Sequence, residues 1–311
     1  MNHIMTDPRS RHWRQLVALV ALTSCGDPSG DTPEPWQEAG HAAQQAYQAQ
    51  RMEEAQTGFR EALRLADEAG SEVGRMNAFE GLAASLAVAG DLDAADSLYT
   101  ILLDLQRQRL EADSLSGMAV VRTLGSLGEI NLRRNDVGRA ERFFTGIMDL
   151  NRRGQVDLRA EDPALAYAVQ GLGEVLGARG QAAAADSLRA RAMGLRLYAQ
   201  GFSLYLGEDM VRAEQAWRRA LAHQDRVLGP DHEDVARTAH ALGRLLEFIG
   251  RSNDAVEPYR RAARIYQVAG GSPIDAASAL DDLAALLQSR QPAHSDSLRQ
   301  RAAQIRSETG S

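Results

Sequence analysis

Small, apolar and polar positions recur along this chain in a fixed order. One copy reads GLGEVLGARGQAAAADSLRARA, and a later copy reads ALGRLLEFIGRSNDAVEPYRRA. Each copy has a small residue in a first amphipathic stretch, then a turn, then an alanine in a second stretch. Apolar residues at helical spacing on both sides of a turn are typical of two helices packed together. The sequence therefore predicts a series of helical hairpins.

The template recurs seven times. The small residue of the first helix is Ala43, Ala83, Gly128, Gly173, Gly201, Gly243 or Ala284. Twelve residues later stand Ala55, Ala95, Ala140, Ala185, Ala213 and Ala255, and the last copy has Ser295 one position earlier. Small residues at both places predict that the two helices of each hairpin approach closely.

Aromatic and turn residues complete the template. Four residues beyond the alanine, five copies carry Phe59, Tyr99, Phe144, Trp217 or Tyr259. We expect this ring to fill the gap to the neighbouring hairpin. Between the two helices stand Gly90, Asn135, Gly180 and Gly250, residue types that suit tight turns.

This pattern resembles the tetratricopeptide repeat, and the stretch RVLGPDHEDVARTAHALGRLL is similar to the linker and first helix of the kinesin-light-chain type. The resemblance covers residues 36–305. It implies an all-α fold, a right-handed superhelical solenoid of about seven helix-turn-helix repeats whose first helices line a concave surface. The chain departs from the family pattern where Ala42 and Gln200 replace a leucine, Arg189 replaces the aromatic, and Ser126, Gly171 and Ala241 replace an asparagine.

The spacing between successive small residues is irregular at one place. It is 40, 45, 45, 28, 42 and 41 residues, and the short interval separates Gly173 from Gly201. Either Gly194 makes an abrupt turn, or residues 182–206 form one long helix. We expect a seam there, with repeats one to four in residues 36–193 and repeats five to seven, plus a C-terminal tail, in residues 194–311.

The first 24 residues have the organisation of an export signal. Arg9, Arg11 and Arg14 precede the apolar run Leu16–Leu22. A run of this length is too short to cross the ~30 Å hydrocarbon layer of a membrane as a permanent helix. The segment is therefore predicted to be a signal peptide.

Cys25 follows this segment and is the single cysteine of the chain. The sequence from Leu22 to Cys25 resembles the bacterial lipobox, which implies lipidation of Cys25 and a flexible tether over residues 25–35. The alternatives are a mispredicted start of the chain and a buried structural thiol, and the adjacent Gly26 and Pro28 disfavour burial. Gly26, in place of the aspartate that retains enterobacterial-type lipoproteins at the inner membrane, favours the outer membrane. We expect a lipid-anchored protein on the periplasmic face of the cell envelope.

Composition excludes several chemistries. All 35 basic residues are arginine, so no lysine can serve a P-loop, a kinase or a Schiff base with a cofactor. The net charge is −7, and arginines are scattered among carboxylates, so the basic patch of a nucleic-acid-binding protein is missing. We expect no nucleic-acid partner.

Three groups of polar residues could suggest chemistry. The densest comprises Asp231, His232, Glu233, Asp234 and His240, but it lacks metal-ligand spacing and is interpreted as a linker with a helix cap. Asp162 and Ser272, each before a proline, are also interpreted as helix caps. The repeated ADSL and SDSL motifs belong to the repeat template. We therefore predict no catalytic residue, no metal site and no cofactor, and hence no enzyme.

A candidate binding surface follows from the resemblance, because the first helices of such repeats face the concave side. Tyr198, Phe202 and Tyr205 form a stripe at helical spacing, for which core packing is the simpler explanation and ligand binding the alternative. The complete candidate set is Arg122, Glu129, Arg133, Tyr167, Glu174, Tyr198, Phe202, Tyr205, Arg237, His240 and Arg244. Mixed charge with interspersed aromatic rings favours a protein or peptide ligand.

The sequence thus predicts a membrane-anchored, non-catalytic scaffold or adaptor for protein–protein interaction. The alternative is a dedicated, pilotin-like assembly factor for an outer-membrane barrel or secretin. The sequence leaves the partner and the oligomeric state open.

Overall fold

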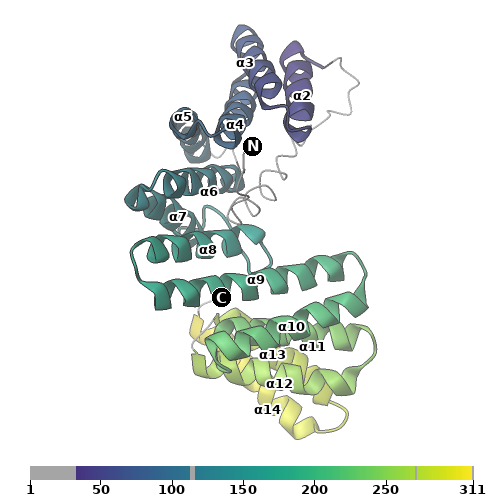
Figure 1. Cartoon of the computed structure of the whole chain (residues 1–311). Helices are drawn as coiled ribbons and strands as arrows, with labels where there is room; N and C mark the ends of the chain where they lie inside the picture. The colour runs from purple at the N-terminus through teal and green to yellow at the C-terminus, as the bar shows by residue number, and fades with distance from the viewer. Residues whose placement is uncertain (1–32, 113–115, 270–271, 310–311) are drawn as a thin grey trace. The chain divides into compact units, whose positions relative to one another are not determined.

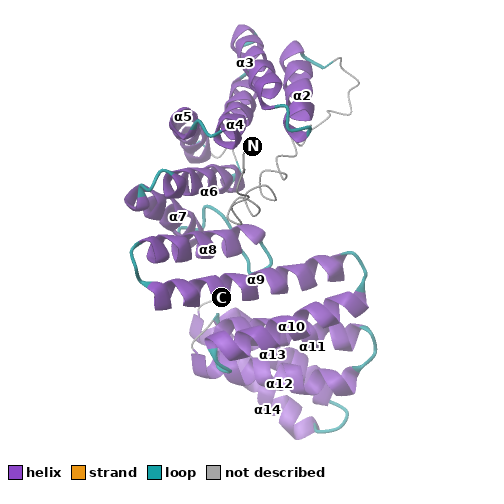
Figure 2. Ribbon diagram, viewed as in Figure 1, coloured by secondary structure: helices purple, strands orange, loops and turns teal. Residues whose placement is uncertain are grey.

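The described parts of the chain consist of helices and the loops that join them, which confirms the all-α prediction. The computed structural model describes residues 33–112, 116–269 and 272–309, and these ranges contain no strand (Figure 2). The helices group into two compact units, Met1–Val156 and Asp157–Ser311. The predicted signal peptide and Cys25 lie outside the described residues.

The first unit consists of three helical hairpins. Each helix packs against the next along the chain, and α2 also contacts α4 (Figure 1). The helices are α2 (Pro35–Gln48), α3 (Met52–Glu68), α4 (Glu72–Ala89), α5 (Leu92–Glu111), α6 (Gly117–Arg133) and α7 (Val137–Arg152).

Within the second unit, successive helices pack together in the same way. Each helix packs on its successor, and α11 also contacts α9 and α13. The helices are α8 (Pro163–Ala178), α9 (Ala182–Leu206), α10 (Met210–Leu228), α11 (Glu233–Phe248), α12 (Ser252–Ala269), α13 (Pro273–Leu287) and α14 (Pro292–Thr309).

Helix α9 is a single element of 25 residues, which Figure 1 shows extending past the end of α8. It carries Ala185 of the fourth copy and Gly201 of the fifth, so it is the second helix of one hairpin and the first helix of the next. Of the two alternatives for the short spacing, the long helix is therefore observed, with Gly194 in its interior. The boundary predicted between residues 193 and 194 falls inside α9, whereas the compact units divide before α8.

The small residues of the template bring the helices together, but the ring packs differently from the expectation. In three hairpins it lies on the first-helix glycine of its own hairpin, where a Cβ atom would approach the ring to 2.5–2.6 Å: Phe144 on Gly128, Trp217 on Gly201 and Tyr259 on Gly243. Each of these glycines leaves the space that the ring occupies.

Phe59 follows the original expectation. It lies against Gly81 of the next hairpin, where a Cβ atom would be 2.3 Å from the ring. The first hairpin has Ala43 in place of the glycine, and its Cβ lies against Gly58 of α3. The helix-to-helix contact there leaves no room for a ring, so the ring packs on the neighbouring hairpin.

The predicted caps are present at the helix starts. Asp162 Oδ1 accepts a hydrogen bond from Ala164 N at 2.8 Å, and Ser272 Oγ accepts one from Asp275 N at 3.3 Å. His232 caps α11 through Nδ1, which accepts from Asp234 N at 3.0 Å. The acidic and histidine-containing group around His232 therefore begins a helix, as interpreted from the sequence.

The predicted turn residues adopt the left-handed backbone conformation. The φ angles are 96° at Gly90, 60° at Asn135, 77° at Gly180 and 80° at Gly250. Glycine and asparagine tolerate this region better than other residues do. These positions therefore reverse the chain between the two helices of a hairpin.

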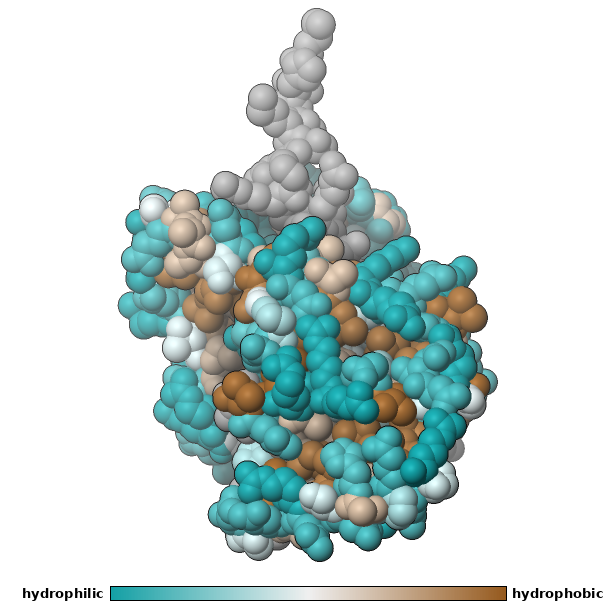
Figure 3. All heavy atoms as spheres, turned by 90° about the horizontal axis from the view of Figure 1, so that it is seen from below, coloured by the Kyte–Doolittle hydropathy of each residue, from teal (hydrophilic) through white to brown (hydrophobic). Residues whose placement is uncertain are grey.

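One face of the molecule is mainly polar. Hydrophilic side chains dominate the face drawn in Figure 3, and apolar residues are scattered among them. Within the described ranges, none of the helices combines the length and the apolar character that crossing a membrane requires.

Candidate interaction surface

The predicted surface residues all lie on the helices that begin hairpins, but they belong to both units. Arg122, Glu129 and Arg133 lie on α6 in the first unit. The other eight lie in the second unit, on α8 (Tyr167, Glu174), α9 (Tyr198, Phe202, Tyr205) and α11 (Arg237, His240, Arg244). Each group is therefore considered within its own unit.

In the first unit, the two arginines of α6 connect it to α4. Arg122 Nε lies 3.5 Å from Glu80 Oε1, and the Arg122 side chain is 47% exposed. Arg133 donates to the carbonyl oxygen of Ala87 at 2.9 Å, in the last turn of α4. The same carbonyl oxygen accepts from Gly90 N at 3.3 Å, so Arg133 adds a second donor, and a positive charge at this end of a helix is favourable. These residues thus hold neighbouring hairpins together.

On α8, Glu174 binds the arginine that replaces the aromatic of the template. Arg189 of α9 donates from Nε to Glu174 Oε1 at 3.1 Å and from Nη2 to Oε2 at 2.9 Å. This two-pronged pair occupies the place that a ring holds in three other hairpins. Tyr167, two turns earlier on α8, is partly buried.

The aromatic stripe of α9 packs on Trp217 of α10. Tyr198 is 7% exposed, its carbonyl oxygen accepts from Trp217 Nε1 at 3.1 Å, and the two rings lie 6.3 Å apart. Phe202 and Tyr205 are partly buried against the same core. Tyr205 lies 6.0 Å from Trp217 and 6.0 Å, edge-on, from Phe248. The stripe is thus anchored in the core, and its outer edge ends at Phe248, which is 66% exposed.

The basic residues of α11 differ in how they are neutralised. Arg237 Nη1 donates to Asp234 Oδ1 at 2.9 Å, and Asp234 is only 2% exposed. His240 Nε2 lies 2.8 Å from Asp282 Oδ2 of α13, so this contact joins two first helices. Arg244 is exposed and forms no ion pair among the described residues. Its charge is therefore available to a ligand.

Burial keeps the hydroxyl groups of Tyr198 and Tyr266 protonated. Desolvation raises the pKa of Tyr198 to about 12, and the negative charge of Glu161 adds to the effect while Arg237 opposes it. Burial likewise raises the pKa of Tyr266. Both side chains are neutral hydrogen-bonding groups at physiological pH.

No pattern in the sequence indicates the ion pair between α9 and α11. Arg191 Nε donates to Asp234 Oδ2 at 2.9 Å, so two arginines share one buried carboxylate. The residues of this pair are 43 positions apart. Helical spacing reveals partners within one helix, and it carries no signal for a contact across that distance.

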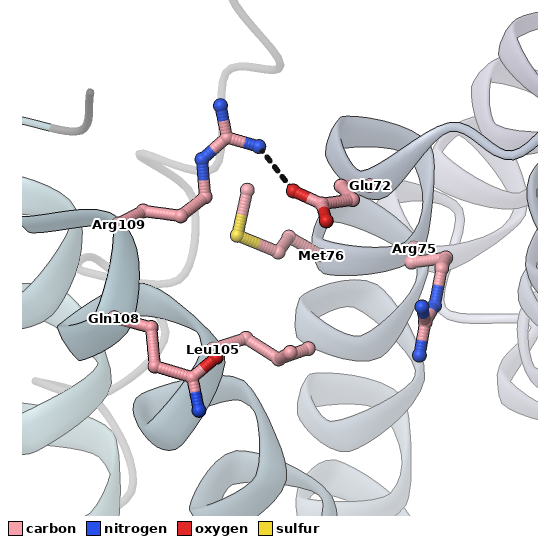
Figure 4. Close-up of a pocket in the computed structure, with 6 residues that line it drawn as sticks. All are labelled: Glu72, Arg75, Met76, Leu105, Gln108 and Arg109. Carbon is pink, nitrogen blue, oxygen red and sulfur yellow. Dashed lines mark hydrogen bonds and ion pairs between the residues drawn. The ribbon is translucent and has the colours of Figure 1, made fainter. Parts of the chain in front are cut away.

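The structure contains a small pocket in the first unit, between α4 and α5 (Figure 4). Its volume is about 40 Å³, and a 2.9 Å contact between Arg109 and Glu72 closes one side. Typical ligand pockets measure about 300–1,000 Å³. The pocket is therefore much smaller than a typical ligand site. The described residues also contain no group of His, Cys, Asp and Glu that could hold a metal ion.

Comparison with known proteins identifies the repeat in part of the second unit. Residues 195–267, from α9 to α12, match the tetratricopeptide repeat family. This match confirms the resemblance drawn from the spacing of small and aromatic residues. The chain has no match among curated proteins.

Several solved structures are similar to this chain. BtubC (BKLC) from P. vanneervenii is 18% identical over 90% of this chain and 93% of that one, with a TM-score of 0.34. Kinesin light chain TPR-like repeats from Podosopora anserina are 15% identical over 78% and 100%, with a TM-score of 0.42. The TPR2AB domain of yeast Sti1 is 14% identical over 86% and 98%, with a TM-score of 0.34. At such identities and scores, these likenesses carry no conclusion about a ligand.

Proposed function

We propose that this chain is a non-catalytic scaffold that binds a protein partner through the first helices of its tetratricopeptide repeats. The observation that carries the proposal is the combination on α9 and α11, within the matched repeat region, of a core-anchored aromatic edge and an exposed arginine without an ion pair. A few residues dominate the binding energy of protein interfaces, and tyrosine, tryptophan and arginine are enriched among them.

We further propose that Cys25 carries a lipid that anchors the scaffold in the cell envelope, on the periplasmic side and preferably at the outer membrane. The support is the basic and apolar sequence before Cys25. A single acyl chain binds membranes only reversibly, whereas the bacterial modification adds several chains. Cys25→Ser should release the protein into the soluble fraction of cell lysates. Unchanged membrane association of that variant would contradict the anchor.

The partner can be sought by mild crosslinking in the native cell, followed by affinity purification of the detergent-extracted protein and mass spectrometry. A specific protein should be recovered. A soluble or regulatory protein would support a general scaffold, and a barrel or secretin in near-equal amount would support the alternative of an assembly factor. Recovery of no specific protein would contradict both.

A matched pair of variants tests whether the proposed surface makes the contact. Arg244→Glu reverses an exposed charge on α11, whereas Arg219→Glu reverses an exposed charge on α10, a second helix. Neither arginine has an ion pair among the described residues, so both variants should fold. Recovery of the partner should fall for Arg244→Glu and persist for Arg219→Glu. Equal recovery with both would place the contact elsewhere.

A further inference from the structure

Arg196 is a partly buried cation that lacks a counter-charge. It lies in the middle of α9, and its guanidinium donates from Nη1 to Oε1 of Gln170, on the adjacent helix α8. No acidic side chain pairs with it among the described residues. The contact with Gln170 satisfies one of the five N–H donors of the guanidinium.

The neighbouring arginines of the same helix are neutralised. Arg189 binds Glu174 through two hydrogen bonds, at 2.9 and 3.1 Å, and Arg191 binds the buried Asp234 at 2.9 Å. These partners lie on α8 and α11, both of which contact α9. The chain thus supplies a carboxylate to each arginine along α9 except Arg196.

The pKa values of Arg196 and Arg189 shift in opposite directions, as expected for an unpaired and a paired guanidinium. Burial is the cause of the lowered pKa of Arg196, and no nearby carboxylate opposes it. The pKa of Arg189 is raised, chiefly by its hydrogen bonds to Glu174. Removing a charge from water without pairing it destabilises the fold. Because the Arg196 guanidinium is partly buried without a counter-charge, its remaining N–H donors can bind an anion from outside the chain.

We propose that Arg196, with Gln170, forms a subsite for an acidic side chain of the protein partner. This inference rests on the proposed function, because it names one chemical feature of the protein that the second unit binds. The guanidinium fork matches the two oxygens of a carboxylate, and such paired hydrogen bonds are among the strongest in interfaces. The side-chain amide of Gln170 holds the fork in place.

The surroundings favour a carboxylate over a phosphate group. Phosphate groups carry up to two negative charges and are usually bound by clusters of arginines. Here one guanidinium stands beside two neutral amides, since the exposed Gln200 lies one turn beyond Arg196 on α9. Arg189, the next arginine along α9 on the α8 side, is paired with Glu174, so it is not free to supply the second positive charge that a dianion favours.

The first measurement requires no partner. Arg196→Met keeps most of the side-chain length and removes the unpaired charge, and Arg189→Met removes a paired one. In the detergent-extracted full chain, Arg196→Met should raise the melting temperature by about 2–4 °C, the usual response to a small gain in stability. Arg189→Met should not raise it. A lower melting temperature for Arg196→Met would show that the charge is already compensated and would overturn the subsite.

The second measurement detects the anion at the residue itself. The ¹⁵Nε–H signal of Arg196 is followed in NMR spectra while sodium acetate, which mimics an acidic side chain, replaces sodium chloride at constant ionic strength. We expect a saturable shift of this signal and none for Arg219. Gln170→Leu should weaken the response. A stronger response to inorganic phosphate would overturn the choice of carboxylate, and the absence of a saturable response to both would overturn the subsite.

These outcomes separate the two proposals. A saturable acetate response with no protein recovered after crosslinking would leave the anion subsite standing and contradict the scaffold function. Recovery of a partner by the native protein and equally by Arg196→Met would support the scaffold and overturn the subsite.

Discussion

Replacing Gly128 with alanine tests the contact between ring and glycine that three of the hairpins share. A Cβ atom at Gly128 would lie 2.6 Å from Phe144 Cζ and 2.8 Å from both Cε atoms. Non-bonded carbon atoms prefer separations of about 3.5–4.0 Å. The ring would therefore have to move by about 1 Å, and Phe144 is only 1% exposed, so it lacks space to move.

The magnitude follows from two opposing effects. Inserting a methyl group into a packed core costs about 1–3 kcal/mol. Glycine to alanine inside a helix gains up to about 1 kcal/mol. Gly146 provides the control, because it lies in α7 of the same hairpin and a Cβ there would meet Leu124 at an ordinary 3.6 Å. Gly128→Ala should therefore be less stable than Gly146→Ala by about 1–3 kcal/mol, since the helix-propensity gain cancels in the comparison.

Amide hydrogen exchange across α6 and α7 is the suitable assay. It reports the opening free energy of this hairpin, so separate unfolding of the second unit does not obscure the result. Gly146→Ala should slow exchange, and Gly128→Ala should accelerate it. Combining Gly128→Ala with Phe144→Leu should recover part of the loss, because the smaller side chain relieves the overlap. Equal protection in the two single variants would refute the packing of the ring on the glycine.

Two further predictions concern the aromatic residues of α9. Tyr205→Ala should lower the free energy of unfolding by about 3 kcal/mol in thermal melts, because the ring packs on Trp217 and Phe248; unchanged melts with weaker partner binding would assign Tyr205 to the ligand instead. Tyr198 is held neutral in the fold with a pKa of about 12, against about 10 when unfolded, so its contribution to stability is complete below pH ~10 and is lost as the pH rises to ~12. The free energy of unfolding, measured with urea at each pH, should therefore fall less steeply with pH for Tyr198→Phe than for the native protein. Parallel pH dependence of the two proteins would contradict a raised pKa of Tyr198.

The fold could be predicted in some detail because its determinants are local. The spacing from a small residue to an alanine fixes which faces of two successive helices meet, and glycine or asparagine between them permits the turn. Caps such as Asp162 act within one turn of their own helix. All of these features lie within a short stretch of sequence, where periodicity and residue type are informative.

The sequence could not decide the rest, because it depends on contacts between distant residues. Gly194 was compatible with a turn and with a helix interior, and packing of α9 against helices on both sides selects the helix. Asp234 was recognised as part of a helix start, but its role as the shared partner of Arg191 and Arg237 needs two helices in place. The lack of a partner for Arg196 becomes visible only when all its neighbours are known.

The continuity of α9 has a consequence for how this chain can evolve. The other hairpins are joined by loops and share no helix, so a whole hairpin can be duplicated or deleted by a break in the loop before it. The fourth and fifth copies share one helix, so recombination between them would cut a continuous row of backbone hydrogen bonds. We therefore expect relatives of this protein to vary in repeat number toward the two ends of the array while inheriting this central pair as one indivisible unit.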